Sequence, residues 1–386
     1  MFGQGRWRTC ALVALLTALA SSQVATAQET SRYSLQGFGG WAYGKTDNDN
    51  SFGYSASPDG VWDNYYFALN VGARPMEKLQ VRAQAYWGDD LRGERTRLDY
   101  VFAEWAQSPS LKLRVGKVLV PFGLYSETYD VGTLRPFYLL PQFYAGTMGL
   151  IPKAYLGGGI TGAPRLGDSW ELQYDAFGGQ IEFEPFEIEL VNGFDPATGL
   201  PTFGTIHAQL VGRDMLGGRL LLQSAEAGVD VGGTIIHMGK LDDPEVGILD
   251  SGGGTFYNLR AQYRKGPLEL RGEFFKADTD AGQGIDSYYA EASYRFLRKW
   301  QVAAQYENSE LQLTGEGASI PKTLRRHESI GLALNFWVSP EFVLKLNGYS
   351  VDGNMIARPE NASLNAFLGR IDDSTGVLLV GAQFSF

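Results

Sequence analysis

An alternation of apolar and polar residues is the feature that most constrains the fold of this 386-residue chain. In the stretch TFYNLRAQYR at 255–264, every second residue from Tyr257 to Tyr263 is apolar or aromatic, and the residues between them are polar. The stretches PLELRGEFF at 267–275 and DSYYAEASYRF at 286–296 follow nearly the same rule. Because successive side chains of a strand point to opposite faces, this period predicts strands with one apolar and one polar face.

Sixteen segments of the chain alternate in this way, and we expect each of them to form a strand. The expected strands lie near 33–43, 62–73, 78–88, 96–106, 111–119, 156–164, 169–178, 212–223, 229–239, 254–265, 267–277, 286–297, 300–310, 326–338, 341–351 and 375–386. The eighth is the least regular of them, because residues 204–228 do not alternate cleanly.

The connections between these segments are short and long in turn. Short connections follow the even-numbered strands, and one of them is the tight turn at Gly266-Pro267. The long connections follow most odd-numbered strands and cover 44–61, 120–155, 179–211, 240–253, 311–325 and 352–374. An outer-membrane barrel has this asymmetry, with short periplasmic turns on one rim and long extracellular loops on the other. The sequence therefore predicts an all-β fold, a transmembrane antiparallel β-barrel of sixteen strands.

The polar faces of the expected strands carry more charges than a dry protein core tolerates. A barrel of this size encloses a lumen wide enough for water, and water accepts such charges. The alternation assigns the following residues to the lumen wall: Arg82, Tyr86, Arg114, Arg260, Arg264, Glu269, Arg271, Glu273, Glu291, Arg295 and Lys345. Because charged rings set the selectivity of a pore, we expect these residues to line a channel.

Residues 1–27 have the layout of a secretory signal peptide. A basic start precedes the apolar run ALVALLTALA, and an Ala-Thr-Ala site places cleavage between Ala27 and Gln28. We expect the remaining residues, 28–386, to form one barrel domain. Cleavage removes the single cysteine, Cys10, and two of the 33 Lys and Arg, which leaves 31 against 43 Asp and Glu and a net charge of −12. An acidic chain of this kind does not favour nucleic acid as a partner.

The third long connection, 120–155, contains PFGLYSETYDVGTLRPFYLLP at 121–141, which is too aromatic for a solvated loop. Three prolines interrupt this segment, so that it forms neither one strand nor one helix. We expect the loop to fold back into the lumen, where it packs apolar side chains on the wall and shows polar ones to the channel. The expected constriction residues are Tyr125, Glu127, Tyr129, Asp130 and Arg135. The two acidic residues among them favour a weak preference for cations.

The stretch RVGKVLVPFGLYSETYDVGTLRP at 114–136 resembles the segment that enters the third loop of proteobacterial outer-membrane porins. It is more loosely similar to the phosphate-selective porins O and P, which share a G-K/R…P-F-G run after a strand. The resemblance implies a sixteen-stranded barrel, often a homotrimer, through which small hydrophilic solutes and ions diffuse. The phosphate-selective members depend on dense arginine ladders and lysines, whereas the inward set of this chain mixes both signs, which puts phosphate specificity in doubt.

The chain ends on an amphipathic strand whose last residue, Phe386, resembles the signal by which the barrel assembly machinery recognises outer-membrane proteins. The expected partners are therefore that machinery, outer-membrane lipid and lipopolysaccharide, and the transported solutes. The expected location is the bacterial outer membrane, with the chain as an integral protein.

Catalysis is not expected. The three histidines, His207, His237 and His327, are scattered, and no G-x-S-x-G motif is present. Acidic runs such as 47–50 and 372–373 are more often solvated loops than calcium sites, so neither a metal nor a cofactor is expected. Two other functions remain open: a substrate-specific channel, for example for an anion, and a barrel whose loops act as an adhesin or receptor.

Overall fold

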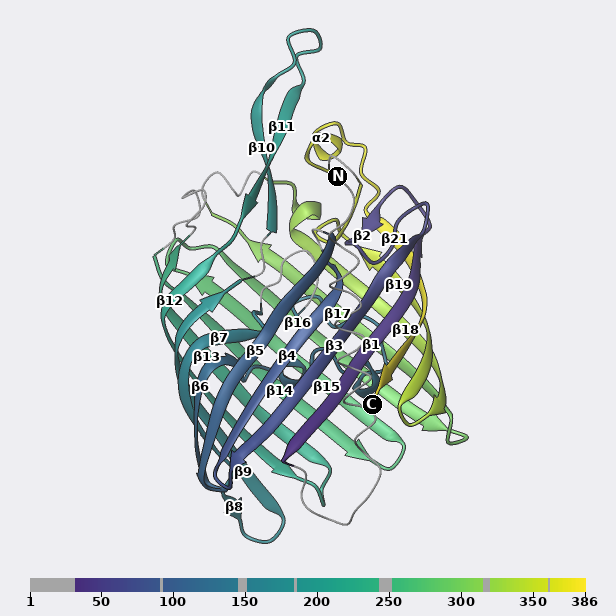
Figure 1. Cartoon of the computed structure of the whole chain (residues 1–386). Coiled ribbons are helices and arrows are strands. Elements are labelled where there is room, and N and C mark those ends of the chain that lie inside the picture. The colour runs from purple at the N-terminus through teal and green to yellow at the C-terminus, as the bar shows by residue number, and fades with distance from the viewer. Residues whose placement is uncertain are drawn as a thin grey trace, which may run out of the picture.

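The computed structural model describes residues 32–90, 93–144, 151–183, 186–242, 252–314, 320–359 and 362–386. The expected signal peptide, with Ala27 and Gln28, lies outside these ranges. One closed sheet of seventeen strands surrounds a lumen (Figure 1). Sixteen of its strands are long, and the seventeenth, β8 (Arg165–Leu166), has two residues and belongs to a turn. The predicted fold, an antiparallel barrel of sixteen strands, is confirmed.

Each of the sixteen long strands overlaps one of the expected segments. Their bounds are β1 Tyr33–Thr46, β3 Val61–Met76, β4 Leu79–Asp90, β5 Gly93–Ser108, β6 Leu111–Leu119, β7 Ala154–Gly162, β9 Trp170–Glu182, β12 Val211–Ser224, β13 Val229–Asp242, β14 Gly254–Lys265, β15 Leu268–Thr279, β16 Gly284–Phe296, β17 Trp300–Gln312, β18 Arg326–Ser339, β19 Phe342–Asp352 and β21 Ser374–Ser385.

The barrel closes where the first and last long strands meet. Strand β1 pairs antiparallel with β3 on one side and with β21 on the other, where Phe38 lies opposite Ser385. The seam extends to the chain end, because Gly37 and Phe386 exchange backbone hydrogen bonds of 3.0 and 2.9 Å. Closure leaves no unpaired strand edge, which is the condition for a β-sheet to cross a membrane.

The two faces of the strands differ as the alternation predicts. In β18, the outward Ile330 and Leu332 are 57% and 62% exposed, whereas the inward Ala333 and Asn335 are 6% and 0% exposed. Exposed Leu, Ile and Val side chains recur on the outside of most other strands, and such an apolar belt is the surface that a barrel presents to lipid. No helix among the described residues is long and apolar enough to cross a membrane.

Short turns gather at one end of the barrel, here called the turn rim, and the longer connections gather at the other, the loop rim (Figure 1). The expected long connection 179–211 is not one irregular loop. It contains a separate hairpin of β10 (Phe186–Phe194) and β11 (Pro201–Ala208), which projects beyond the loop rim. The segment FEIEL alternates and Asp195–Gly199 supplies a turn, so the signal was present in the sequence.

Two loops at the loop rim are tied together and are not simply solvated. Strand β2 (Ser51–Phe52) pairs with β20 (Ala357–Arg358), and the short helix α2 (Ala362–Phe367) follows. The side-chain amide of Asn50, which is 1% exposed, donates to the carbonyl of Asp372 at 2.8 Å. The acidic run 47–50 therefore holds the loops on both sides of the seam in place.

Candidate functional site

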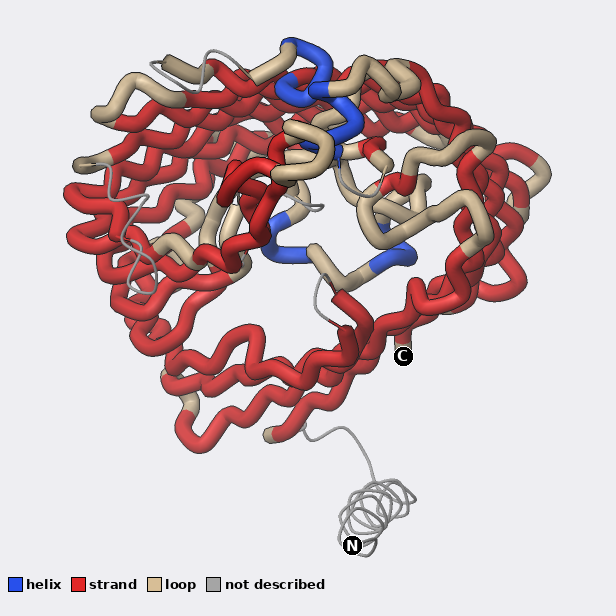
Figure 2. Tube along the Cα trace, turned by 90° about the horizontal axis from the view of Figure 1, so that it is seen from above, coloured by secondary structure: helices blue, strands red, loops and turns tan. Residues whose placement is uncertain are grey.

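The loop between β6 and β7 leaves the wall at Pro121 and crosses the lumen. Figure 2, seen from above, shows irregular chain and short helices inside the ring of strands. Within this segment, residues 120–144 include the 3₁₀ helices η1 (Ser126–Thr128) and η2 (Gly132–Leu134) and are here called the lumen loop. Their polypeptide is irregular at membrane depth, which is tolerated because it faces protein and not lipid.

The lumen loop is anchored by aromatic packing on inward residues of the wall. Phe122, Phe137 and Tyr144 are each 1% exposed. Phe143 stacks on Phe275 of β15 with ring centroids 5.4 Å apart, and Phe122 meets the same ring edge-on at 5.7 Å. Buried aromatic pairs of these geometries stabilise beyond the area that they cover. The apolar half of the loop is therefore fixed to the wall.

A sharp turn at Gly123 lets the loop approach β15. Gly123 has φ +55°, in the left-handed region that favours glycine, and a Cβ there would collide with the Tyr144 hydroxyl and with Glu273. Glu273 accepts hydrogen bonds from the Leu124 amide at 3.1 Å and the Tyr144 hydroxyl at 2.7 Å. Burial and the neighbouring Glu273 raise the pKa of Tyr144 well above its usual range, so its hydroxyl keeps the proton that it donates.

Lys345 of β19 is the anchor at the other end of the loop. Its ammonium, 2% exposed, donates to the carbonyls of Gly132, Arg135 and Phe137 at 2.9, 2.6 and 3.1 Å. The neighbouring Asn347 accepts from the Tyr138 amide at 2.7 Å. Three donors on three converging carbonyls match the geometry of an ammonium group, so the backbone of this segment is held without a carboxylate.

Two arginines of the wall also bond the loop. Arg271 donates to the Tyr125 hydroxyl at 2.8 Å and to the Leu134 carbonyl at 3.1 Å, and it pairs with Glu269 at 2.7 Å and Glu291 at 3.2 Å. Arg260 donates to the carbonyl of Gly123. A buried charge is costly unless it is both paired and hydrogen-bonded. Wall carboxylates pair with both arginines, Glu269 and Glu291 with Arg271 and Asp230 with Arg260, and the loop adds further hydrogen-bond acceptors.

Asp130 lies on the side of the loop that faces β4. Its carboxylate pairs with Lys153 at 2.6 Å and accepts from Gln84 at 2.5 Å. Lys153 also pairs with Asp99 at 2.8 Å. Asp130 is 6% exposed, so its charge is neutralised and shielded from the channel.

Glu127 is the exposed carboxylate of the lumen loop. Its side chain is 39% exposed and pairs with Arg219 of β12 at 2.7 Å, and Arg219 also pairs with Asp175 at 2.8 Å. Burial within the lumen would raise the pKa of Glu127, but the Arg219 guanidinium, with Arg114 and Arg260 farther off, lowers it below the ordinary value of 4.5. Glu127 is thus a permanent negative charge beside several arginines.

The wall formed by β5 and β6 carries charges that pair with each other. Arg114 pairs with Glu104 on the neighbouring strand at 2.7 Å, and Lys112 lies 3.9 Å from the same carboxylate. The side chains of Arg114, Glu104 and Lys112 are 21%, 13% and 37% exposed. Arg82 of β4 is exposed nearer the turn rim. These side chains remain in contact with the solvent of the lumen.

The loop divides the expected pore-lining residues into two groups. Residues that remain exposed or partly exposed are Arg82, Tyr86, Arg114, Arg264, Glu269 and Arg295. Residues that are buried beneath or beside the loop are Arg260, Arg271, Glu273, Glu291 and Lys345. The second group does not face open water, because the loop covers it. The sequence could not show this, since the alternation reports which face of the strand a residue is on and not what covers that face.

The expected constriction residues divide in the same way. Glu127 is exposed and Tyr129 is partly buried, whereas Tyr125, Asp130 and Arg135 are 4%, 6% and 8% exposed. The expectation that Asp130 and Arg135 face the channel is therefore wrong. Arg135 donates to the carbonyls of Tyr129 at 2.6 Å and Tyr138 at 2.9 Å, so it fixes the shape of the loop.

Several residues of this site escaped the sequence analysis, among them Arg219, Lys153 and Asn347. Arg219 lies in the strand with the poorest alternation, where the pairing of β12 with β9 shifts register between Gly212 and Met215. Lys153 lies outside any strand, so parity assigned it no face. Asn347 carries no charge, although its position two residues from Lys345 on an inward face was a usable signal.

Two of the three histidines, His327 and His237, have described side chains, and they lie on different strands, β18 and β13. His327 is 0% exposed beneath the loop rim, with its ring centroid 6.1 Å from that of Phe52. His237 faces outward on β13 and contacts the Thr255 hydroxyl at 3.0 Å. The side chain of His207 lies outside the described part of the structure. Over the ranges that the structure describes, no group of three His, Cys, Asp or Glu side chains is arranged to hold a metal ion.

Comparison with known proteins identifies the architecture. No protein-family model matches the sequence. No curated protein matches it either. Among solved structures, the outer membrane channel DcaP of Acinetobacter baumannii is similar with a TM-score of 0.54 and 11% identity over 94% of this chain and 100% of that one. OmpF of Salmonella typhi, solved in complex with daunomycin, is similar with a TM-score of 0.54 and 13% identity over 92% of this chain and 97% of that one.

The anion-selective porin from Comamonas acidovorans is also similar, with a TM-score of 0.52 and 13% identity over 92% of this chain and 99% of that one. At such low identities these similarities establish the fold and no more. The predicted resemblance to outer-membrane porins is confirmed at that level, and the looser likeness to phosphate-selective porins stays a prediction. The chain has the fold of the outer-membrane porins.

Proposed function

We propose that this chain is an integral outer-membrane porin that forms a water-filled channel for passive diffusion of small hydrophilic solutes and ions. The observation that carries the proposal is the lumen loop, which crosses a charged lumen and leaves Glu127 exposed beside Arg219 and within the field of Arg114. A charged lumen narrowed by a fixed loop is suited to sieving small solutes in water. The proposal assigns no catalytic activity and no cofactor to the chain.

We also propose how the chain is exported, assembled and placed in the outer membrane. The leader at 1–27 directs export, and Phe386, 61% exposed and stacked on Phe67 with centroids 6.4 Å apart, is presented at the seam for the barrel assembly machinery. The outward apolar belt contacts lipid, and the loop rim meets lipopolysaccharide. One solved relative, OmpT of Vibrio cholerae with a TM-score of 0.51, was obtained in a trimer form, which supports a homotrimer here.

Planar-bilayer recording of the purified protein tests the proposal. We expect stepwise conductance that is ohmic and rises in proportion to the KCl concentration, because ions move through water and do not bind tightly. The absence of conductance steps in a preparation that retains β-sheet circular dichroism would overturn it. That result would favour the alternative of a barrel whose loops, including the β10–β11 hairpin, bind a partner.

A second candidate, a channel specific for an anion, is favoured by the composition of the lumen near the turn rim. The described residues that line a cavity there include five arginines and one glutamate. Current that saturates with rising concentration of one anion would distinguish this candidate from general diffusion.

A further inference from the structure

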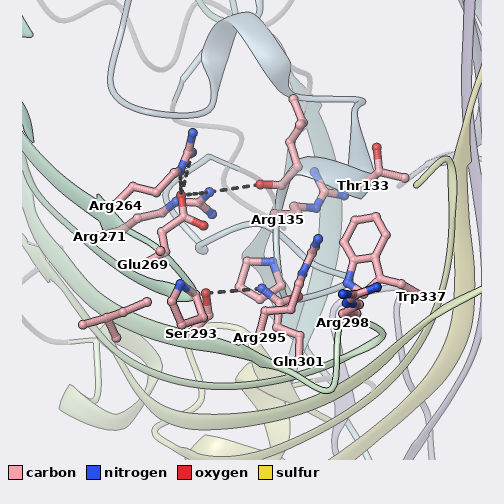
Figure 3. A pocket seen from close by; sticks show the side chains of 15 residues that line it. Thr133, Arg135, Arg264, Glu269, Arg271, Ser293, Arg295, Arg298, Gln301 and Trp337 are labelled. Carbon is pink, nitrogen blue, oxygen red and sulfur yellow. Dashed lines mark hydrogen bonds and ion pairs between the residues drawn. The ribbon is translucent and has the colours of Figure 1, made fainter. Parts of the chain in front are cut away.

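A cavity of about 480 Å³ lies between the lumen loop and the turns of the turn rim. The lumen loop contributes residues 133–136, and the wall contributes residues around the turns at 266–267 and 297–299. Arginine dominates the described residues of its lining, with Glu269 as the only acidic residue among them: Arg135, Arg264, Arg271, Arg295 and Arg298. Figure 3 shows these side chains converging on the cavity from opposite sides.

The two ends of the cavity differ in their charge balance. At one end, Glu269 pairs with both Arg264 and Arg271 at 2.7 Å, so the arginines there are already neutralised in part (Figure 3). At the other end, Arg295 lies over the ring of Trp337, and Arg298 lines the same cavity (Figure 3). Neither arginine has a carboxylate within ion-pair distance in the described part of the chain. The positive charge of the cavity is therefore concentrated at the Trp337 end.

Trp337 supplies a second, independent sign of a ligand. Its side chain is 9% exposed and lines the cavity, and its indole Nε1 has no hydrogen-bond partner among the described residues. The guanidinium of Arg295 lies over the indole ring at 4.2 Å, which fixes the arginine without neutralising it. A buried donor without an acceptor is costly, and a ligand oxygen at this position would satisfy it.

Other polar groups line the same end. Ser293 and Gln301 are 4% and 8% exposed, and the Gln301 amide donates to the Ser293 oxygen at 3.3 Å, which leaves the serine hydroxyl proton free to donate elsewhere. The lining thus offers two guanidinium groups, an indole N–H and a hydroxyl, all of them donors. Donors without matching acceptors select an oxyanion.

The backbone at Arg298 supports this interpretation. Leu297 and Arg298 have φ of 47° and 61°, in the left-handed region, whereas the adjacent turn places Gly266 there with φ 59°. Glycine adopts this conformation without steric cost, and arginine does not. The turn therefore carries a cationic side chain at a position where glycine fits the backbone better.

We propose that the Trp337 end of this cavity binds a small organic oxyanion, a sulfonate or carboxylate, that reaches it from the turn rim. The oxyanion bridges Arg295 and Arg298 and accepts from the indole N–H of Trp337. The inference rests on the proposed channel function and gives it a substrate class. The site lies on the turn-rim side of the lumen loop, and Glu127 is not among the described residues that line it.

Calorimetric titration of the purified protein in detergent tests the site, with benzenesulfonate as the probe. Benzenesulfonamide is the neutral analogue of the same size, and methanesulfonate tells whether the organic body contributes. We expect benzenesulfonate to bind and benzenesulfonamide not to bind. Arg295→Gln and Arg298→Gln should each weaken binding by about tenfold, the effect of losing one charge-assisted hydrogen bond.

The turn also offers a matched control. Lys299→Gln removes the same charge from the same turn, but Lys299 points outward, where its ammonium lies 5.8 Å from the ring of Phe336. It should leave benzenesulfonate affinity unchanged. Arg298→Gly, which suits the backbone, should weaken binding as Arg298→Gln does while the heat stability of the barrel is kept.

The outcomes separate this site from the channel. The site is overturned if benzenesulfonate and benzenesulfonamide bind with equal affinity. It is also overturned if Lys299→Gln and Arg298→Gln reduce the affinity for benzenesulfonate equally. Neither outcome affects the conductance result. Binding with the expected pattern in a protein that passes no current would overturn the proposed channel and retain the site. In bilayers, benzenesulfonate should interrupt the current more often from the turn-rim side than from the loop-rim side.

Discussion

The inner wall of this barrel has two regions with the same sequence pattern and different environments. On the covered wall, which runs from β14 to β21, inward polar side chains bond the lumen loop, as Lys345 and Asn347 do through its backbone. On the open wall of β5 and β6, Arg114 and Glu104 bond each other across neighbouring strands and stay partly exposed. The loop, and not the strand, decides whether an inward charge is structural or available to a solute.

The charged side chains of the covered wall and the backbone of the lumen loop satisfy each other's hydrogen-bonding groups. An ion that loses its water needs several polar partners, and the irregular backbone of the loop supplies them as carbonyl and amide groups. The loop in turn needs donors and acceptors for a backbone that has no sheet or long helix. The loop backbone offsets the desolvation of the wall charges, and the wall charges satisfy the loop backbone. The polar groups of the covered wall therefore hold the loop across the lumen.

Of the changes that distinguish the covered wall from the open wall, Lys345→Met on the covered wall should have the largest effect. The change removes the donor to three buried carbonyls, and an unsatisfied buried acceptor costs roughly 1 kcal/mol, so the free energy of unfolding should fall by roughly 3 kcal/mol. The freed loop should also produce noisier current. Thermal unfolding followed by circular dichroism, together with single-channel recording, measures both effects. Lys322→Met, at a side chain that is 67% exposed, is the matched control and should change neither.

A smaller effect is expected from Glu127→Gln at the boundary between the two regions. A unit charge about 6 Å from a passing ion contributes roughly 0.7 kcal/mol at the dielectric constant of water. Its loss should change the permeability of each monovalent ion about threefold, in opposite directions for cations and anions, and so shift the anion-to-cation ratio about tenfold toward anions. The reversal potential under a KCl gradient measures it. Glu310→Gln, at a 48% exposed side chain outside the lumen loop, is the control. An equal shift for both variants would show that Glu127 has no special position.

The smallest effect is expected from pH. Because Arg219 holds the pKa of Glu127 below 4.5, the carboxylate is ionised at neutral and mildly acidic pH. The contribution of this pair to stability is complete above the unfolded pKa and is lost only as the pH falls through the lower folded pKa. The reversal potential of the wild type should therefore stay constant from about pH 7 to about pH 5 and drift toward anions at lower pH. A midpoint above pH 5 that disappears in Glu127→Gln contradicts the account.

The strands were predictable because one local rule determines them. Period-two alternation fixes both the strand and the face of each residue, and it placed Arg271 and Glu273 on the inward face of β15 as the structure has them. Even the irregular segment 212–223 lies within β12, because closure of the sheet leaves no alternative to pairing there.

The site was only partly predictable because it depends on contacts between distant parts of the chain. The composition of 121–141 indicated a loop packed inside the barrel, but not which wall it covers. That choice follows from side chains more than 100 residues away, such as Lys345 with Gly132 and Glu273 with Leu124. Asp130 looked like a channel charge until Lys153 was seen beside it.

We infer that the lumen loop narrows a water-filled channel. The decisive measurement is the single-channel conductance of a variant that lacks residues 125–134, which include η1 and η2. We predict larger conductance steps than in the wild type at the same KCl concentration, in a protein that keeps the β-sheet spectrum of the intact barrel. Steps of unchanged size in a folded variant would contradict the claim, because the current would then be limited somewhere other than at the lumen loop.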